Sequence, residues 1–199
     1  MKISHYLGWL LLVNLSFCFC YGQTFIIDKK YTGAPFVKDV NLSELIDNCA
    51  INDETSMKFT NKKRELDRKR CPLNTTKFDF TKLYDLIDKK KTIYRDGDFE
   101  LVINSEKYET ANYFDFSLNK IVYEVNLSLV YKQEVKKQIL LASYSYNTIA
   151  ALYLSSQYYY IDLDGDIYLL SLDEYSDHID SVNKFHYRID KDNLDFVEL

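Results

Sequence analysis

The sequence predicts an α+β fold: a small helical N-terminal part packed on an antiparallel β-meander (a curled sheet or partial barrel), with one disulfide. Two observations support this prediction. Only two tyrosines lie between residues 23 and 90, whereas fourteen lie from Tyr94 onward. At the same boundary the apolar residues change from the spacing of a helix face to the alternation of a strand, the environment that tyrosine suits.

Residues 1–22 have the pattern of a cleavable secretory signal peptide. A basic start precedes an apolar stretch from Leu7 to Phe19, and Cys20 and Gly22 place small side chains three and one residues before the expected cut. The apolar stretch is shorter than the roughly 20 residues of a permanent membrane helix. A lipid anchor on Cys18 or Cys20 is the alternative, but a bulky phenylalanine precedes each cysteine. We therefore expect a secreted or periplasmic protein.

Removing the signal leaves 24 basic and 30 acidic residues, a net charge of −6, in residues 23–199. Nucleic acids bind basic surfaces, so this balance argues against a nucleic-acid partner. No apolar run in the remainder is long enough for an integral membrane segment. A chain of this length forms one domain with a substantial core, so we expect a single α+β domain that is mainly helical in residues 23–90 and mainly sheet in residues 91–199.

Short helices are expected in the N-terminal part. Asn41 followed by Glu44 has the spacing of a capping box, which predicts a helix that ends near Cys49. Apolar residues recur at the spacing of one helix face over residues 80–87, which predicts a further helix. The remaining expected elements are a strand at Phe25–Ile27, a turn at Thr32–Pro35 and a solvated helix or ordered loop at residues 53–70.

Two cysteines remain after export, Cys49 and Cys71. An oxidising compartment favours their pairing, and the bond closes a loop of 21 intervening residues. For a loop of this length the chain-entropy estimate gives about 3 kcal/mol of stabilisation. The alternative is a pair of free buried thiols. We expect the disulfide, which encloses the one basic segment of an acidic protein.

From residue 91 onward apolar residues alternate with polar ones, as a half-buried antiparallel strand requires. The clearest example runs from Ile121 to Tyr131. Further strands are expected at Thr92–Tyr94, Phe99–Ile103, Tyr113–Phe116, Gln138–Tyr146, Ile149–Leu154, Gln157–Leu163, Asp166–Leu172, Phe185–Ile189 and Leu194–Val197. Short polar breaks connect them in chain order, as in a meander.

Two Asp-Gly pairs, Asp96-Gly97 and Asp164-Gly165, are expected to form hairpin turns. Asp-Gly favours the two-residue type I′ turn because both central residues need positive φ. In the second hairpin this turn predicts the pairs Leu163–Asp166, Ile161–Tyr168 and Tyr159–Leu170. Both faces of that hairpin carry large side chains, so we expect it to be central or covered on both sides.

The acidic residues of the second hairpin have a metal-binding alternative. Asp162, Asp164 and Asp166 have the alternate spacing of a calcium loop, but Gly165 stands at the fourth position and the EF-hand needs its glycine at the sixth. A hairpin explains every one of these residues without a metal. We therefore interpret the segment as a turn.

No catalytic motif is found. His178 and His186 are the two histidines of residues 23–199, whereas zinc catalysis needs about three protein ligands. No glycine-framed serine and no glycine-rich phosphate loop occurs. A pair of carboxylates, as in glycosidases, is the remaining route to an enzyme. We assign no catalytic, cofactor-binding or metal-binding residue and expect no cofactor.

Two groups of residues are candidates for an interface. Tyr158 and Tyr160 belong to a tyrosine run, and tyrosine combines a large contact area with a polar tip. Arg68, Lys69 and Arg70 end a basic segment that suits an acidic partner, an anionic lipid surface or a processing protease. The alternatives are core packing for the tyrosines and a solvated face for the basic residues.

Three asparagines begin Asn-x-Ser/Thr sequons and are candidate glycosylation sites: Asn41, Asn74 and Asn126.

The sequence features as a whole favour a secreted or periplasmic, non-enzymatic binding protein that acts by protein–protein recognition, such as an inhibitor, an immunity-type protein or a host-interface factor. One alternative is a lipocalin-like carrier of a small apolar ligand inside a closed meander. A weaker alternative is a secreted hydrolase.

Overall fold

The computed structural model describes residues 24–49, 71, 73, 89–110, 120–147, 153–175 and 179–199. Several expectations fall outside these residues: the signal peptide, the elements at 53–70, 80–87 and 113–116, Arg68, Lys69, Arg70, Asn74 and His178. Within the described residues no helix has the length and apolar character needed to cross a membrane.

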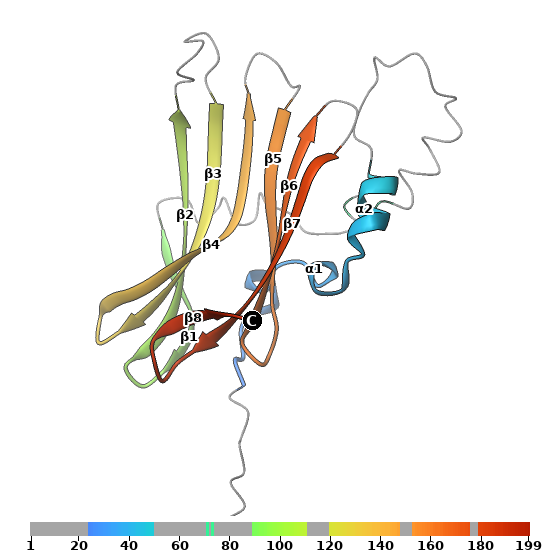
Figure 1. The fold of residues 1–199 in the computed structure, drawn as a ribbon. Coiled ribbons are helices and arrows are strands. Elements are labelled where there is room, and N and C mark those ends of the chain that lie inside the picture. The colour runs from blue at the N-terminus through green and yellow to red at the C-terminus, as the bar shows by residue number, and fades with distance from the viewer. Residues whose placement is uncertain are drawn as a thin grey trace, which may run out of the picture.

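Eight strands form one antiparallel sheet in which each strand pairs with the next along the chain (Figure 1). They are β1 (Lys90–Asp96), β2 (Phe99–Thr110), β3 (Lys120–Tyr131), β4 (Glu134–Asn147), β5 (Tyr153–Ile161), β6 (Asp166–Tyr175), β7 (Ile179–Asp190) and β8 (Asp195–Glu198). The predicted meander is confirmed. The sheet is curled but not closed, because β1 and β8 remain its two edges.

Helix content is lower than the predicted α+β class implies. The described residues contain two short α-helices, α1 (Phe36–Asp39) and α2 (Leu42–Asn48), and one 3₁₀ turn, η1 (Lys29–Tyr31). The Asn41 cap is confirmed, since its Oδ1 accepts hydrogen bonds from the backbone N–H groups of Ser43 and Glu44 at 3.0 and 3.3 Å. The fold is therefore mainly β. Residues 24–34 are mostly irregular, because their backbone forms hydrogen bonds to β5 and to the β5–β6 turn and their apolar side chains are buried against the sheet.

The sheet divides between its fourth and fifth strands. β4 and β5 pair only where residues 143–146 meet residues 154–157, and beyond that point the two strands diverge (Figure 1). The Nε2 group of Gln157 donates to the carbonyl oxygens of Leu140 and Leu141 at 2.8 and 3.2 Å, where the divergence begins. The division produces two arms, β1–β4 and β5–β8, which pack against each other.

A hydrophobic core fills the space between the two arms. It contains buried side chains of both arms together with Phe25, Ile27 and Tyr31 from the N-terminal segment. Tyr159 is fully buried there and donates its hydroxyl to the carbonyl oxygen of Tyr31 at 2.9 Å. Burial raises the pKa of the Tyr159 phenol above its ordinary value. The N-terminal segment is thus an integral part of the core.

Residues 32–34 pair with the edge of β5 that β4 has left. The N–H of Ile161 donates to the carbonyl of Thr32, and the N–H of Ala34 donates to the carbonyl of Tyr159, both at 2.8 Å. Gly33 lies between them with φ +81°, and an added Cβ would stand 2.1 Å from the Tyr159 oxygen. The expected turn at Thr32–Pro35 therefore also serves as a short edge pairing.

The predicted strand at Phe25–Ile27 is wrong. These residues form no strand ladder, although the N–H of Phe25 donates to the carbonyl of Leu163 at 2.7 Å. The alternating burial of Phe25 and Ile27 comes from their insertion between the arms. A short apolar alternation does not separate these two environments.

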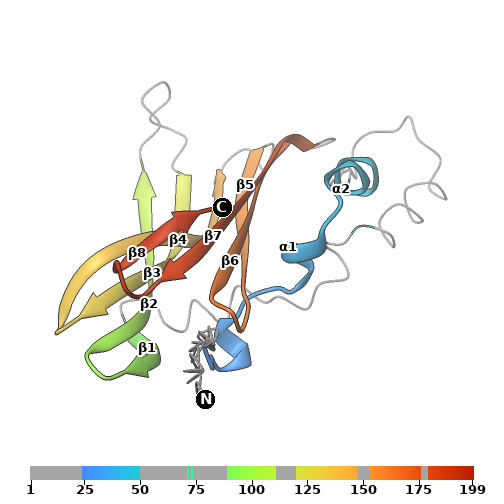
Figure 2. The same ribbon diagram turned by 60° about the horizontal axis from the view of Figure 1, so that its bottom comes forward.

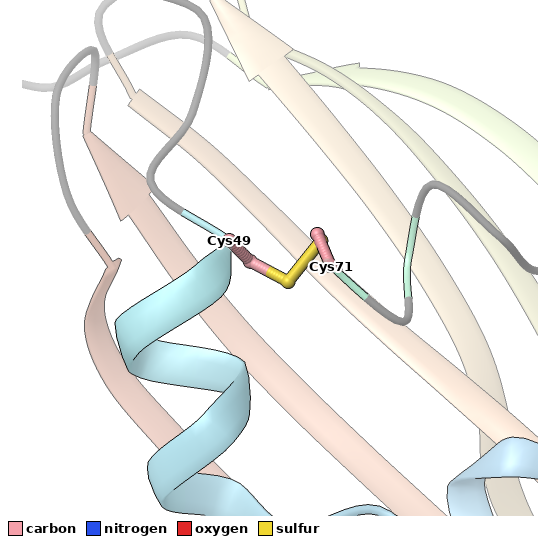
Figure 3. The surroundings of a disulfide bond; sticks show 2 residues. All are labelled: Cys49 and Cys71. Atoms are coloured by element: carbon pink, nitrogen blue, oxygen red, sulfur yellow. A yellow bond between two sulfur atoms is a disulfide. The ribbon is translucent and has the colours of Figure 1, made fainter. Parts of the chain in front are cut away.

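The other face of β5–β7 carries α1 and α2 (Figures 1 and 2). Val37 and Leu45 are fully buried against this face, together with Leu170 and Leu172 of β6. At the end of α2, Cys49 and Cys71 form the predicted disulfide, with the sulfur atoms 2.06 Å apart (Figure 3). The expectation that the β5–β6 hairpin is covered on both sides is met.

The predicted turn types at the two Asp-Gly pairs are wrong. In the β5–β6 loop Asp162 Oδ1 accepts from the N–H groups of Asp164 and Asp166, both at 3.0 Å, and Gly165 alone has positive φ. The loop therefore has three residues, and the register shifts by one to Ile161–Ile167, Tyr160–Tyr168 and Tyr159–Leu169.

In the β1–β2 hairpin the loop is Gly97-Asp98, and only Gly97 has positive φ. Two successive positive φ angles, which the type I′ turn requires, occur instead at Lys132 and Gln133 between β3 and β4. An Asp-Gly pair favours a turn, but it does not by itself determine which residues occupy the centre of the turn.

Candidate protein interface

The predicted interface tyrosines lie on the outer face of β5, the face that also carries α1. Tyr158 and Tyr160 are half-buried, whereas Tyr159 between them points into the core. The ring of Tyr158 packs edge-on against Phe36 of α1, with centroids 5.9 Å apart and an interplanar angle of 67°. Tyr158 therefore helps to hold α1 against the sheet, whereas the ring of Tyr160 contacts β6.

Tyr160 begins a row of three stacked rings across adjacent strands. The strand register places Tyr160 of β5 beside Tyr168 of β6, and Tyr168 beside His186 of β7. The Tyr160 and Tyr168 rings are 6.3 Å apart at 22°, and the Tyr168 and His186 rings are 4.4 Å apart at 14°. Stacking against both neighbours restricts the rotation of Tyr168.

Ion pairs lie between this row and the β5–β6 turn. Lys38 Nζ lies 3.0 Å from Asp162 Oδ2 and 5.2 Å from the centre of the Tyr168 ring. Arg188 donates from Nε and Nη2 to the two carboxylate oxygens of Asp166 at 2.6 and 3.0 Å. His186 Nε2 stands 3.2 Å from Asp166 Oδ2.

The carboxylates are covered while their cationic partners face solvent. The side chains of Asp162 and Asp166 are each 10% exposed, whereas that of Arg188 is 53% exposed. Burial by itself raises the pKa of Asp166, but the two hydrogen bonds from Arg188 and the nearby His186 ring outweigh it, so the net pKa is lowered. The hydrogen bond to Asp162 is the largest cause of the raised pKa of Lys38. The lowered pKa of Asp166 and the raised pKa of Lys38 keep both groups charged at neutral pH.

A second row beside the aromatic one, formed by Asp166 and Arg188, continues onto the last strand. Val197 of β8 pairs with Arg188 across the β7–β8 ladder, so the two side chains are neighbours on one face. The Val197 side chain is 41% exposed. We call the face formed by Tyr160, Tyr168, His186, Arg188 and Val197 the ladder face; Tyr160 and His186 are half-buried on it, and Tyr168 lies buried between them.

The acidic residues of the β5–β6 turn serve the hairpin and the ion pairs. Asp162 accepts from two backbone N–H groups and from Lys38, and Asp166 accepts from Arg188. In the described part of the chain no group of three or more metal-ligating side chains gathers closely enough to hold an ion.

Two of the candidate glycosylation sites lie in the described residues. Asn41 is exposed and caps α2, and Asn126 is half-buried on β3.

Sequence reasoning found parts of the ladder face but not their association. Tyr160 was considered as an interface residue, His186 as a zinc ligand and Asp166 as a calcium ligand, each separately from the others. The one-residue error in the β5–β6 register placed Ile161, rather than Tyr160, beside Tyr168. Lys38 was missed because its partner Asp162 is 124 positions away in the chain.

Comparison of the chain with family models, with curated proteins and with solved structures found no match.

Proposed function

We propose that this protein is a secreted or periplasmic binding protein that acts by protein–protein recognition, without catalysis, through the ladder face. The observation that carries the proposal is the combination of the half-buried Tyr160, a half-exposed arginine and an exposed valine on one face, with the buried Tyr168 ring stacked behind Tyr160. Tyrosine and arginine are enriched at interface centres and dominate measured binding energies.

The geometry suits recognition because the side chains are already ordered. Arg188 is fixed by two hydrogen bonds to Asp166, and Tyr168 is fixed by the rings on both sides. Ordering a long side chain upon binding costs about 0.5–1.5 kcal/mol, so a preformed surface keeps more of its contact energy as affinity.

Two observations favour recognition over the carrier and the hydrolase. A carrier of an apolar ligand needs space inside its sheet, whereas the space between the two arms is occupied by side chains that include Phe25 and Tyr159. A hydrolase needs a positioned base, and His186 is stacked on Tyr168 beside the Asp166–Arg188 pair. His178 lies outside the described residues.

The test is affinity capture of a partner from the native surroundings of the protein, followed by binding measurements with variants. Two exposed strand valines provide a matched comparison: Val197 on the ladder face and Val135 on β4, which is 55% exposed. We expect Arg188→Gln to weaken binding about 30-fold and Val197→Ser about fivefold, whereas Val135→Ser has no effect.

Melting curves of each variant show whether the fold is retained. A partner whose affinity is unchanged by both Arg188→Gln and Val197→Ser would contradict the ladder face as the binding surface. Failure to capture any macromolecule, combined with a small molecule that co-purifies in native mass spectrometry, would favour the carrier instead.

A further inference from the structure

A shallow groove of about 610 Å³ lies beside the first strand of the sheet, away from the ladder face. One wall is formed by four consecutive residues of β1, from Thr92 to Arg95, and the other by Thr24 and Ile26 of the N-terminal segment. Successive side chains of a strand point to opposite faces. This alternation is interrupted between Thr92 and Tyr94, where Ile93 and Tyr94 both pack against the core. The groove is placed instead by its other wall: it lies between β1 and the N-terminal segment, and no residue of β2 lines it.

This edge of β1 is open to another strand. Among the described residues β1 pairs with β2 alone and stands at one end of the sheet order (Figure 2). An open edge presents backbone donors and acceptors that an extended peptide satisfies by adding a strand. On the facing wall the side chain of Ile26 is 79% exposed and offers an apolar contact to such a peptide.

The charge along the edge defines what the added strand must carry. Lys89, Lys90 and Lys91 are all exposed at the start of β1. Arg95, at the far end of the groove, is 63% exposed and paired with Glu100. No carboxylate among the described residues pairs with these three lysines, so they make this a basic edge in a protein of net charge −5.

A second copy of the chain is a poor occupant for this groove. Two β1 edges brought together would place their lysines close to one another, and like charges opposite each other destabilise strand pairing. Lysines along an edge also discourage pairing with an edge of the same charge. An acidic segment converts the same lysines into favourable partners.

We infer that the β1 groove binds an extended acidic segment of a partner protein, which adds to the sheet as a further strand. Main-chain hydrogen bonds to β1 hold the segment, its carboxylates meet Lys89, Lys90 and Lys91, and its apolar side chains contact Ile26. The inference concerns a different surface from the ladder face and does not depend on it.

The probe is a fluorescent eight-residue peptide that alternates glutamate and threonine, compared with the same peptide carrying lysine in place of glutamate. Anisotropy measures binding to the full protein secreted from an expression host. The acidic peptide is expected to bind at least about tenfold more tightly than the basic one. Amide exchange should slow in β1 when the acidic peptide is bound.

Two double variants carry the same charge change. Lys90→Glu with Lys91→Glu should weaken binding of the acidic peptide at least about tenfold. Lys136→Glu with Lys137→Glu, on exposed lysines of β4, is the control and should leave binding within about twofold. Arg188→Gln should also leave peptide binding unchanged, which separates this inference from the function proposed for the ladder face.

Three results would overturn the inference. The first is that the acidic peptide does not bind. The second is an equal loss of binding in both double variants, which would indicate attraction by net charge alone. The third is amide exchange that slows elsewhere in the protein but not in β1. Concentration-dependent dimers that the Lys90→Glu, Lys91→Glu variant strengthens would show instead that the edge pairs with a second copy.

Discussion

Lys132 and Gln133 form the turn between β3 and β4 with φ angles of +51° and +67°. An L-residue in this left-handed region costs roughly 1–2 kcal/mol, whereas glycine adopts it freely. Both residues are exposed, and the contact of Lys132 Nζ with the Tyr131 ring, 5.3 Å from its centre, is an exposed one that offsets little of the strain. The turn is thus a local weakness in an otherwise regular hairpin.

Gln133→Gly should raise the free energy of unfolding by about 0.5–1 kcal/mol, because relief of strain exceeds the added entropy of the unfolded chain. Urea denaturation measures the change. Gln138→Gly, at an exposed position inside β4, is the control and should lower stability by a similar amount. Destabilisation by both substitutions would contradict the assigned turn.

Asp166 gives stability a defined pH dependence. Its folded-state pKa is lowered below the unfolded value of about 3.9, so its contribution is present above that pH and is lost as the pH falls through the folded pKa. Asp166→Asn should therefore cost about 2 kcal/mol at pH 7, and the difference from the wild type should shrink between about pH 5 and pH 2.

Chemical denaturation at a series of pH values measures this difference. Asp192→Asn removes the same charge at an exposed position and is the control for net charge. If Asp166→Asn stays less stable than the wild type by the same amount at every pH, the Arg188–Asp166 pair does not control the titration.

At the scale of elements, the N-terminal segment completes the sheet. β4 leaves the edge of β5 uncovered, and residues 32–34 occupy that edge through hydrogen bonds to Tyr159 and Ile161. The close approach of Gly33 to the Tyr159 carbonyl makes glycine necessary at this point. The division of the sheet and the position of the segment therefore depend on each other.

Gly33→Ala should lower the free energy of unfolding by at least about 3 kcal/mol, because strain at positive φ adds to a clash with backbone. Gly97→Ala is a matched control: its φ is also positive, but an added Cβ meets nothing within 4 Å, so it should cost only about 1 kcal/mol. Urea denaturation measures both. Equal costs would contradict the close packing of the segment on β5.

The arrangement of strands at this scale was largely predictable, whereas the pairing across the β5–β6 turn was not. Alternation in β3 and β6 is a property of neighbouring residues and predicts those strands directly. The register depends on the Asp162 side chain, which captures two N–H groups and enlarges the turn. That single difference decides whether Tyr160 or Ile161 lies beside Tyr168, and so whether the aromatic row forms.

At the scale of the whole molecule, the disulfide joins Cys71 to the end of α2 across 22 positions of the chain. Replacing both cysteines by serine should lower the free energy of unfolding by about 3 kcal/mol, because the unfolded chain gains the freedom that the bond removes. A reducing agent should bring the wild type to the same stability and leave the variant unchanged. No effect of reductant on the wild type would show that the bond contributes nothing to stability.

The sequence alone determined that this chain forms an antiparallel meander, where most strands lie, which cysteines pair and where Asn41 starts a helix. These features depend on alternation, spacing and composition, which short stretches of chain contain. Only the tertiary structure decided the rest. The division between β4 and β5, the insertion of Phe25 between the arms and the contact of Lys38 with Asp162 join residues far apart in the chain. Such contacts depend on how whole elements pack, and no local pattern encodes them.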